Sequence, residues 1–130
     1  MKILVVEDDV DLRAEIVGFL RRRSHEVVTS GSIAAAHEAL QEMLADGQMP
    51  EAVICDVGLP DGDGVDFCVA AAASVPACRW LLLSGGHDFT RLESQLAGQA
   101  GLTHIIVEKP IHMELLQRFL EAPHRLTADG

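Results

Sequence analysis

Short apolar runs alternate with longer amphipathic segments along this chain of 130 residues. The runs are rich in Val, Ile and Leu, as the buried strands of parallel sheets are. The segment after the first run places Leu12, Ile16 and Phe19 at helical spacing. Strand and helix alternate five times, which predicts an α/β fold with a parallel sheet covered by helices on both faces. The expected strands are 2–6, 26–29, 52–55, 79–83 and 104–107.

Capping residues and turn formers locate the helices between these strands. Asp9 and Asp11 suit the start of the first helix, and the arginines at 21–23 suit its end. Ser32 is expected to cap a second helix that runs to about Leu44. Later helices are expected to about residue 73, over 89–100 and over 112–121, with a turn-rich loop at 58–64. Residues 1–122 are then a single domain, and 123–130 form a short polar tail.

Composition narrows the classes of protein that fit this pattern. Ten basic and twenty acidic residues give a net charge of −10, which argues against unaided binding to nucleic acid or to an anionic membrane. The three cysteines lack CxxC spacing, as reduced thiols in a cytosol do. No apolar run approaches the roughly 18 residues of a membrane span, and the first residues lack a signal-peptide pattern. We therefore expect a cytoplasmic protein.

Polar residues able to hold a metal ion and a phosphoryl group follow four of the five expected strands. Glu7 and Asp8 follow the first, Asp56 the third, Ser84 the fourth and Lys109 the fifth. Ligands of open α/β sheets bind at the carboxyl ends of the strands, so we expect these side chains to converge.

The chemistry of these residues explains why they would gather. Two carboxylates about 4 Å apart repel by about 4 kcal/mol at an effective dielectric near 20, so Glu7, Asp8 and Asp56 need a compensating cation. Carboxylates with open water positions suit Mg²⁺. A carboxylate can also act as a nucleophile and form an aspartyl phosphate. Lys109 and the Ser84 hydroxyl could then neutralise and hydrogen-bond the phosphoryl oxygens.

Four fragments carry a family resemblance when they are taken in order. They are ILVVEDD, VICDVGLPDGDG, LLLSGG and VEKP, and each covers the end of an expected strand. The chain resembles a response-regulator receiver domain of two-component signalling, over nearly its full length. The resemblance implies a flavodoxin-like, three-layer αβα domain with a five-stranded parallel sheet of order 2-1-3-4-5.

The resemblance also implies a role for each residue of the site. Asp56 would accept a phosphoryl group from a sensor histidine kinase or a phosphotransfer protein. Mg²⁺ would be bound directly by Asp8, Asp56 and the backbone carbonyl of Gly58, and by Glu7 through water. Ser84 and Lys109 would contact the phosphoryl group.

Further expectations follow from the same likeness. Lys109 would pair with Asp56 beforehand, and Pro110 would follow a cis peptide bond. The domain would be a switch rather than an enzyme with an external substrate. It would catalyse only its own phosphorylation and dephosphorylation, and act on an unknown output partner or output domain.

Three positions depart from the family pattern. Ile106 stands where receivers usually carry an aromatic ring, and a stiff, apolar Ile side chain has little reason to move outward. We therefore expect Ile106 to stay inside in both states, and the signal to leave through the loop 84–88, including His87. Gly58 and Gly86, each two residues beyond a site residue, offer no side chain to guide hydrolytic water.

Other functions fit the residues less well. The main alternative is a degenerate receiver that binds proteins without being phosphorylated, which the intact acid, Ser and Lys set disfavours. An aspartyl phosphatase usually has an acid two residues after its nucleophile, where this chain has Gly58. The net charge and the lack of a helix-turn-helix segment after residue 121 disfavour a DNA-binding regulator. A calcium loop at 61–72 would need Glu in its last place, where the residue is Ala72.

Overall fold

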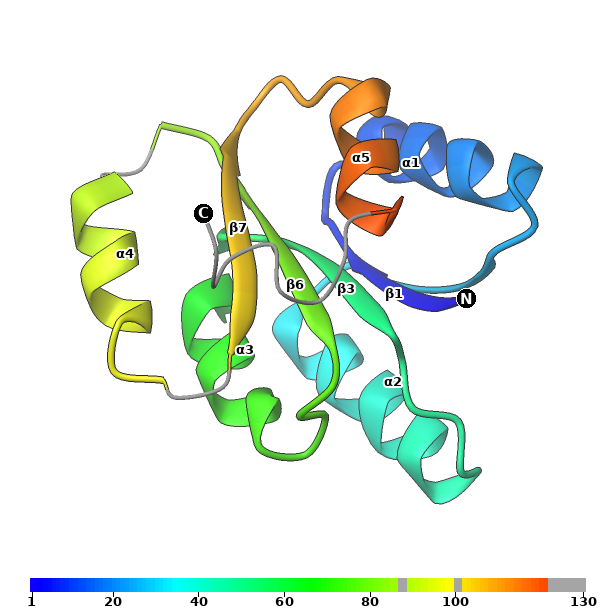
Figure 1. The fold of residues 1–130 in the computed structure, drawn as a ribbon, viewed down its shortest axis with the longest axis horizontal. Helices are drawn as coiled ribbons and strands as arrows, with labels where there is room; N and C mark the ends of the chain where they lie inside the picture. The colour runs from blue at the N-terminus through cyan, green and yellow to red at the C-terminus, as the bar shows by residue number, and fades with distance from the viewer. Residues whose placement is uncertain (87–88, 100–101, 122–130) are drawn as a thin grey trace.

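A five-stranded parallel sheet forms the middle layer of the domain (Figure 1). In this computed structural model, residues 1–86, 89–99 and 102–121 are described. The sheet order is β2-β1-β3-β6-β7, which confirms the predicted order 2-1-3-4-5. Its strands are β1 (Lys2–Val6), β2 (Glu26–Ser30), β3 (Ala52–Asp56), β6 (Arg79–Ser84) and β7 (Thr103–Glu108).

Helices cover both faces of the sheet, as expected. One face carries α1 (Val10–Arg22) and α5 (Met113–Glu121), and the other carries α2 (Ile33–Ala45), α3 (Gly64–Ala72) and α4 (Phe89–Leu96) (Figure 1). Alternate strand residues enter the two cores: Ile3 and Val5 pack with α1 and α5, whereas Leu4 and Val6 pack with the other helices. The period of two along a strand therefore divides the apolar residues between two cores.

Burial differs between the centre and the edge of the sheet. All residues of β3 and β6 are buried, whereas the first five residues of the edge strand β7 are only half-buried. Arg79, at the start of β6, is buried and donates hydrogen bonds to the carbonyl oxygens of Phe119 and Leu120 at 3.1 and 2.9 Å. It thereby satisfies carbonyls in the last turn of α5.

The helix starts follow the capping residues in the sequence. The Asp9 carboxylate accepts from the amides of Asp11 and Leu12 and caps α1, and the Ser32 hydroxyl accepts from Ala35 N and caps α2. The Ser32 cap confirms the sequence prediction, and Asp9, predicted only as an acid at the start of the first helix, is in addition its N-cap. Asp63, within the expected loop, caps α3 by accepting from Val65 N at 2.7 Å.

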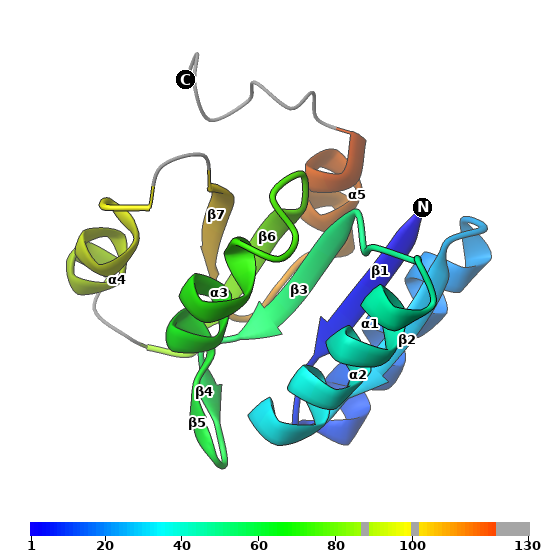
Figure 2. The same cartoon turned by 90° about the horizontal axis from the view of Figure 1, so that it is seen from below.

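Two expectations about local structure were right only in part. The expected loop at 58–64 contains a small antiparallel hairpin of β4 (Gly58–Leu59) and β5 (Gly62–Asp63), which leaves the sheet on the side of α2 and α3 (Figure 2). The helix expected over 89–100 ends at Leu96, before Gly98, because glycine disfavours helix continuation.

Some expectations fall outside the described residues. They concern His87 and Asp88 in the loop after β6 and the tail at 123–130. Over the described ranges, every helix is too short or too polar to span a lipid bilayer.

Candidate functional site

Three consecutive acids follow β1, and the structure gives each a different place. Glu7 is fully buried, and its amide continues the sheet by donating to Ser30 O at 3.0 Å. Asp8 is exposed, whereas Asp9 is the N-cap of α1. The Asp9 amide donates to Glu7 Oε2 at 3.0 Å. The β1–α1 turn thus fixes the Glu7 carboxylate through its own backbone.

Asp56, the last residue of β3, is held from two sides. Its Oδ1 accepts from Gly58 N at 3.1 Å, and its Oδ2 accepts from Lys109 Nζ at 2.9 Å. The residue is buried, with an exposed fraction of 4%. The carboxylate is therefore oriented by its neighbours instead of rotating freely in solvent.

Lys109 bridges the two buried carboxylates. Its Nζ lies 3.0 Å from Glu7 Oε1 in addition to the contact with Asp56, and its backbone amide donates to Ser84 O at 2.8 Å. The Lys109–Pro110 peptide is cis, as predicted. Burial lowers the pKa of Lys109, but the contacts with Asp56 and Glu7 outweigh it and raise the pKa above its ordinary value. The ammonium is thus held in its charged form.

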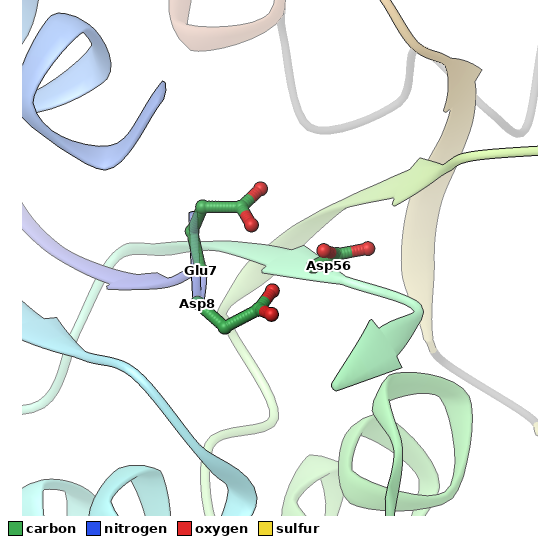
Figure 3. A group of neighbouring side chains, drawn as sticks. All are labelled: Glu7, Asp8 and Asp56. Atoms are coloured by element: carbon green, nitrogen blue, oxygen red, sulfur yellow. The ribbon is translucent and has the colours of Figure 1, made fainter. Parts of the chain in front are cut away.

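The carboxylates of Glu7, Asp8 and Asp56 face one another (Figure 3). One oxygen of each lies within 4.8 Å of the others. Burial, against the opposing effects of the Asp9 amide and Lys109, raises the pKa of Glu7 to about 7. Burial therefore makes the Glu7 carboxylate easier to protonate than an exposed one, and the nearby charge of Asp56 adds to the effect. Hard oxygen donors with an exposed member, Asp8, fit a divalent cation such as Mg²⁺.

Ser84 lies at the same edge of the sheet. It ends β6, is fully buried and stands one position beyond Leu83, the residue that pairs with Asp56 in the neighbouring strand. Gly86 follows with φ of +99°, a conformation that residues with a Cβ rarely adopt. The glycine predicted to leave hydrolytic water unguided is therefore also required by the backbone.

Two residues of the loop after Asp56, Asp61 and Gly64, belong to this region but were not predicted to do so from the sequence. A Cβ at Gly64 would lie 2.1 Å from Asp56 O, so only glycine allows α3 to start against the end of β3. Asp61 accepts hydrogen bonds from the first amides of α2. The last glycine of the DGDG segment at 61–64 could have pointed to Gly64. Nothing local could have pointed to the role of Asp61, because its hydrogen-bond partners lie 27 and 28 residues away in the sequence.

Comparison with known proteins decides the family of this chain. The profile of the family "Response regulator receiver domain" matches residues 3–121. The chain belongs to the response-regulator receiver domain family. Receiver domains of this family are signalling switches of two-component systems.

Curated relatives of this receiver domain are bacterial response regulators. The transcriptional regulatory protein PrrA of Mycobacterium tuberculosis is 31% identical over 121 residues, which cover 90% of this chain and 47% of PrrA. The response regulator receiver protein CpdR of Brucella abortus is 25% identical, and the match covers 92% of this chain and 93% of CpdR. The chain thus spans about half the length of PrrA but nearly all of CpdR.

Solved structures of receivers share the fold. A CheY-like receiver domain protein from Methanospirillum hungatei superposes with a TM-score of 0.79 at 18% identity, covering 99% of this chain and 98% of that one. A beryllofluoride-activated DrrB receiver domain superposes with a TM-score of 0.69 at 27% identity, and the match covers 93% of this chain and 97% of that one. A response regulator from Burkholderia pseudomallei superposes with a TM-score of 0.76 at 20% identity, and the match covers 98% of this chain and 71% of that one. That structure contains a phosphorylated aspartic acid and a calcium ion.

The position of the missing aromatic ring lies on the edge strand of this receiver domain. Ile106 is half-buried, pairs with Leu82 and packs against the core under α2, α3 and α4. It is less buried than expected, because an edge strand has a neighbouring strand on one side only.

Proposed function

We propose that this receiver domain is a phosphorylation-dependent switch whose acceptor is Asp56. The supporting observation is the orientation of its carboxylate, with Oδ2 on Lys109 Nζ and Oδ1 on Gly58 N, beside Glu7 and Asp8. The donor is a phosphohistidine of a sensor histidine kinase or a phosphotransfer protein.

The transfer needs positioning and charge neutralisation more than covalent chemistry from the protein. A carboxylate oxygen of Asp56 forms the new O–P bond while the P–N bond of the phosphohistidine breaks, and the imidazole leaves with the bonding electrons. Lys109 moves its contact from Asp56 to a phosphoryl oxygen, and the Ser84 hydroxyl donates to another. These steps require no external substrate other than the phosphodonor.

A divalent cation supplies charge neutralisation between the carboxylates and the phosphoryl oxygens when it is bound. Asp8, Asp56 and the Gly58 carbonyl would hold Mg²⁺ directly, with Glu7 acting through water. Glu7 is suited to the water-mediated place because it lies buried behind the exposed Asp8 and already contacts Lys109.

The output lies with a partner or with another domain. The relatives PrrA and DevR/DosR are about twice as long as the matched region, so the DNA binding named for DevR/DosR says nothing of this chain by itself. CpdR, nearly matched in length, is named a receiver protein. We propose that the phosphorylated domain acts through protein contacts, because its acidic charge opposes direct contact with nucleic acid.

The phosphoryl analogue beryllofluoride tests the acceptor. With Mg²⁺, we expect a saturable change in the amide NMR spectrum centred on residues 56–60, 84–86 and 106–110, and Asp56→Asn should abolish it. Asp66→Asn, an exposed acid in the first turn of α3, is the matched control and should respond like the wild type. A full response in Asp56→Asn would reject Asp56 as acceptor. No response in any protein would favour a degenerate receiver.

A further inference from the structure

The start of α2 is held by a residue from a distant part of the chain. Asp61 accepts from Ile33 N at 2.8 Å through Oδ1 and from Ala34 N at 3.0 Å through Oδ2. Ser32, the local cap, accepts from Ala35 N at 3.1 Å. Of the first three amides of α2, one therefore donates to the local cap Ser32 and two donate to Asp61, in the loop that follows Asp56.

Asp61 supplies the negative charge that the N-terminus of α2 otherwise lacks. The first turn of this helix contains no acidic residue, so the negative charge that favours a helix N-terminus comes from Asp61. Hydrogen bonds from the Ile33 and Ala34 amides lower the pKa of Asp61, which keeps it ionised. Since Ser32 already marks the start of the helix, the Asp61 contact adds a tie between two separate elements.

The other end of this tie is the phosphoacceptor loop. Asp61 lies in the turn between β4 and β5, and β4 begins with Gly58, whose amide donates to Asp56 Oδ1. The hairpin runs close to α2, because a Cβ on Gly62 would lie 3.3 Å from Ile33 Cγ1. Figure 2 shows the hairpin standing away from the sheet, near the first turn of α2.

A hairpin of this size needs an anchor. Each strand has two residues, and isolated two-stranded hairpins are marginal even when they are longer. Its base is fixed where Gly64 N donates to Val57 O and Asp63 caps α3. Its tip is fixed by the two hydrogen bonds between Asp61 and α2. The position of Gly58 therefore depends on contacts at both ends of the hairpin.

We propose that Asp61 is a positioning residue for the metal site: by tying the hairpin to α2, it fixes the Gly58 carbonyl relative to Asp8 and Asp56. This inference rests on the proposed Mg²⁺ site. Linkage makes the coupling reciprocal, so Mg²⁺ binding slows hydrogen exchange of the Ile33 and Ala34 amides. The start of α2 then reports the state of a site to which it contributes no ligand.

Two caps on one helix provide a matched pair of variants. Asp61→Ala and Ser32→Ala each remove a cap from α2, and both should lower the unfolding temperature by about 5 °C. Only Asp61→Ala also releases the hairpin. A Mg²⁺ titration followed by amide NMR should show about tenfold weaker binding in Asp61→Ala, as for other residues that orient metal ligands. Ser32→Ala should bind Mg²⁺ like the wild type.

A second measurement uses metal-free protein. Asp61→Ala should shift the amide resonances of Val57 and Gly58, whereas Ser32→Ala should leave them in place. Unchanged Mg²⁺ affinity in Asp61→Ala, or equal weakening in both variants, would overturn the proposal. If the wild type binds no Mg²⁺, the proposed metal site fails, and the metal-free shifts alone decide whether Asp61 positions the hairpin.

Discussion

Leu82 and Ile106 face each other across β6 and β7, yet they occupy different environments. They pair in register and point into the same core, but Leu82 is fully buried whereas Ile106 is half-buried. A strand lies on each side of β6 and on only one side of β7. Two runs of three aliphatic residues, 81–83 and 105–107, therefore differ in how much apolar surface they remove from water.

The same contrast divides the site. Glu7, Asp56 and Ser84 end or follow fully enclosed strands and are themselves buried. Lys109 follows the edge strand, and its side chain reaches inward to two carboxylates while its amide is tied to Ser84 O. The centre of the sheet supplies fixed acids, and the edge supplies a cation on a flexible stem. In the proposed function, a phosphoryl group would replace Asp56 as the partner of Lys109 without disturbing the central strands.

The largest effect should come from truncating the two paired residues. Leu82→Ala should lower the free energy of unfolding by about 4 kcal/mol, because it leaves a cavity in a core with no solvent access. Ile106→Ala should lower the free energy of unfolding by at most half as much, about 1–2 kcal/mol, because part of that side chain already meets water. Urea denaturation of both variants measures the difference. Equal losses would show that the edge position is packed as tightly as the centre.

A smaller effect concerns the pH dependence of metal-free stability. The pKa of Glu7 is raised from 4.5 to about 7 in the folded protein. The unfolded chain therefore releases this proton first, and stability falls as pH rises from about 4.5 to about 7. We expect a loss of about 2 kcal/mol, less than the full value of the shift because Lys109 and nearby solvent screen the charge.

Glu7→Gln should remove this decline. The exposed helical acid Glu38 offers the control, since Glu38→Gln should leave the decline unchanged. Unfolding curves at pH 5 and pH 8 with a chelator present give the measurement. A decline of the same size in Glu7→Gln and wild type would mean that Glu7 is not the titrating group.

The smallest expected change is at Ile106 itself. Its side chain packs against the core, and moving it outward would expose more apolar surface at about 25 cal/mol per Å². We expect methyl NMR to show only slight shifts for Ile106 on addition of beryllofluoride and Mg²⁺, with larger changes near Ser84. The methyl groups of Ile3, buried in the opposite core, serve as the reference. A large Ile106 shift together with new solvent contacts would show that the usual coupling operates without an aromatic ring.

Much of the fold and site followed from local pattern. The five strands, an acid at Asp9 in the start of the first helix and the cap at Ser32 were predicted and are present. The cis bond before Pro110, which the family resemblance implied, is also present. The gathering of Glu7, Asp56 and Lys109 was predicted because parallel strands place their carboxyl ends at one edge. These features depend on residue type and on short spacing, so the sequence carries them directly.

Other features depend on neighbours that are distant in the chain. Glu7 and Asp8 are adjacent acids, but only the folded sheet decides that Glu7 is enclosed while Asp8 stays exposed. The composition of 58–64 correctly indicated turns, yet the anchoring of the hairpin depends on Asp61 meeting an α2 amide 28 residues away. Local patterns of residue type were therefore enough to predict the order of strands and helices and the chemistry at the strand ends. Burial, the raised pKa of Glu7 and the tie between hairpin and helix were decided by tertiary structure, because each arises from groups that meet only after the chain has folded.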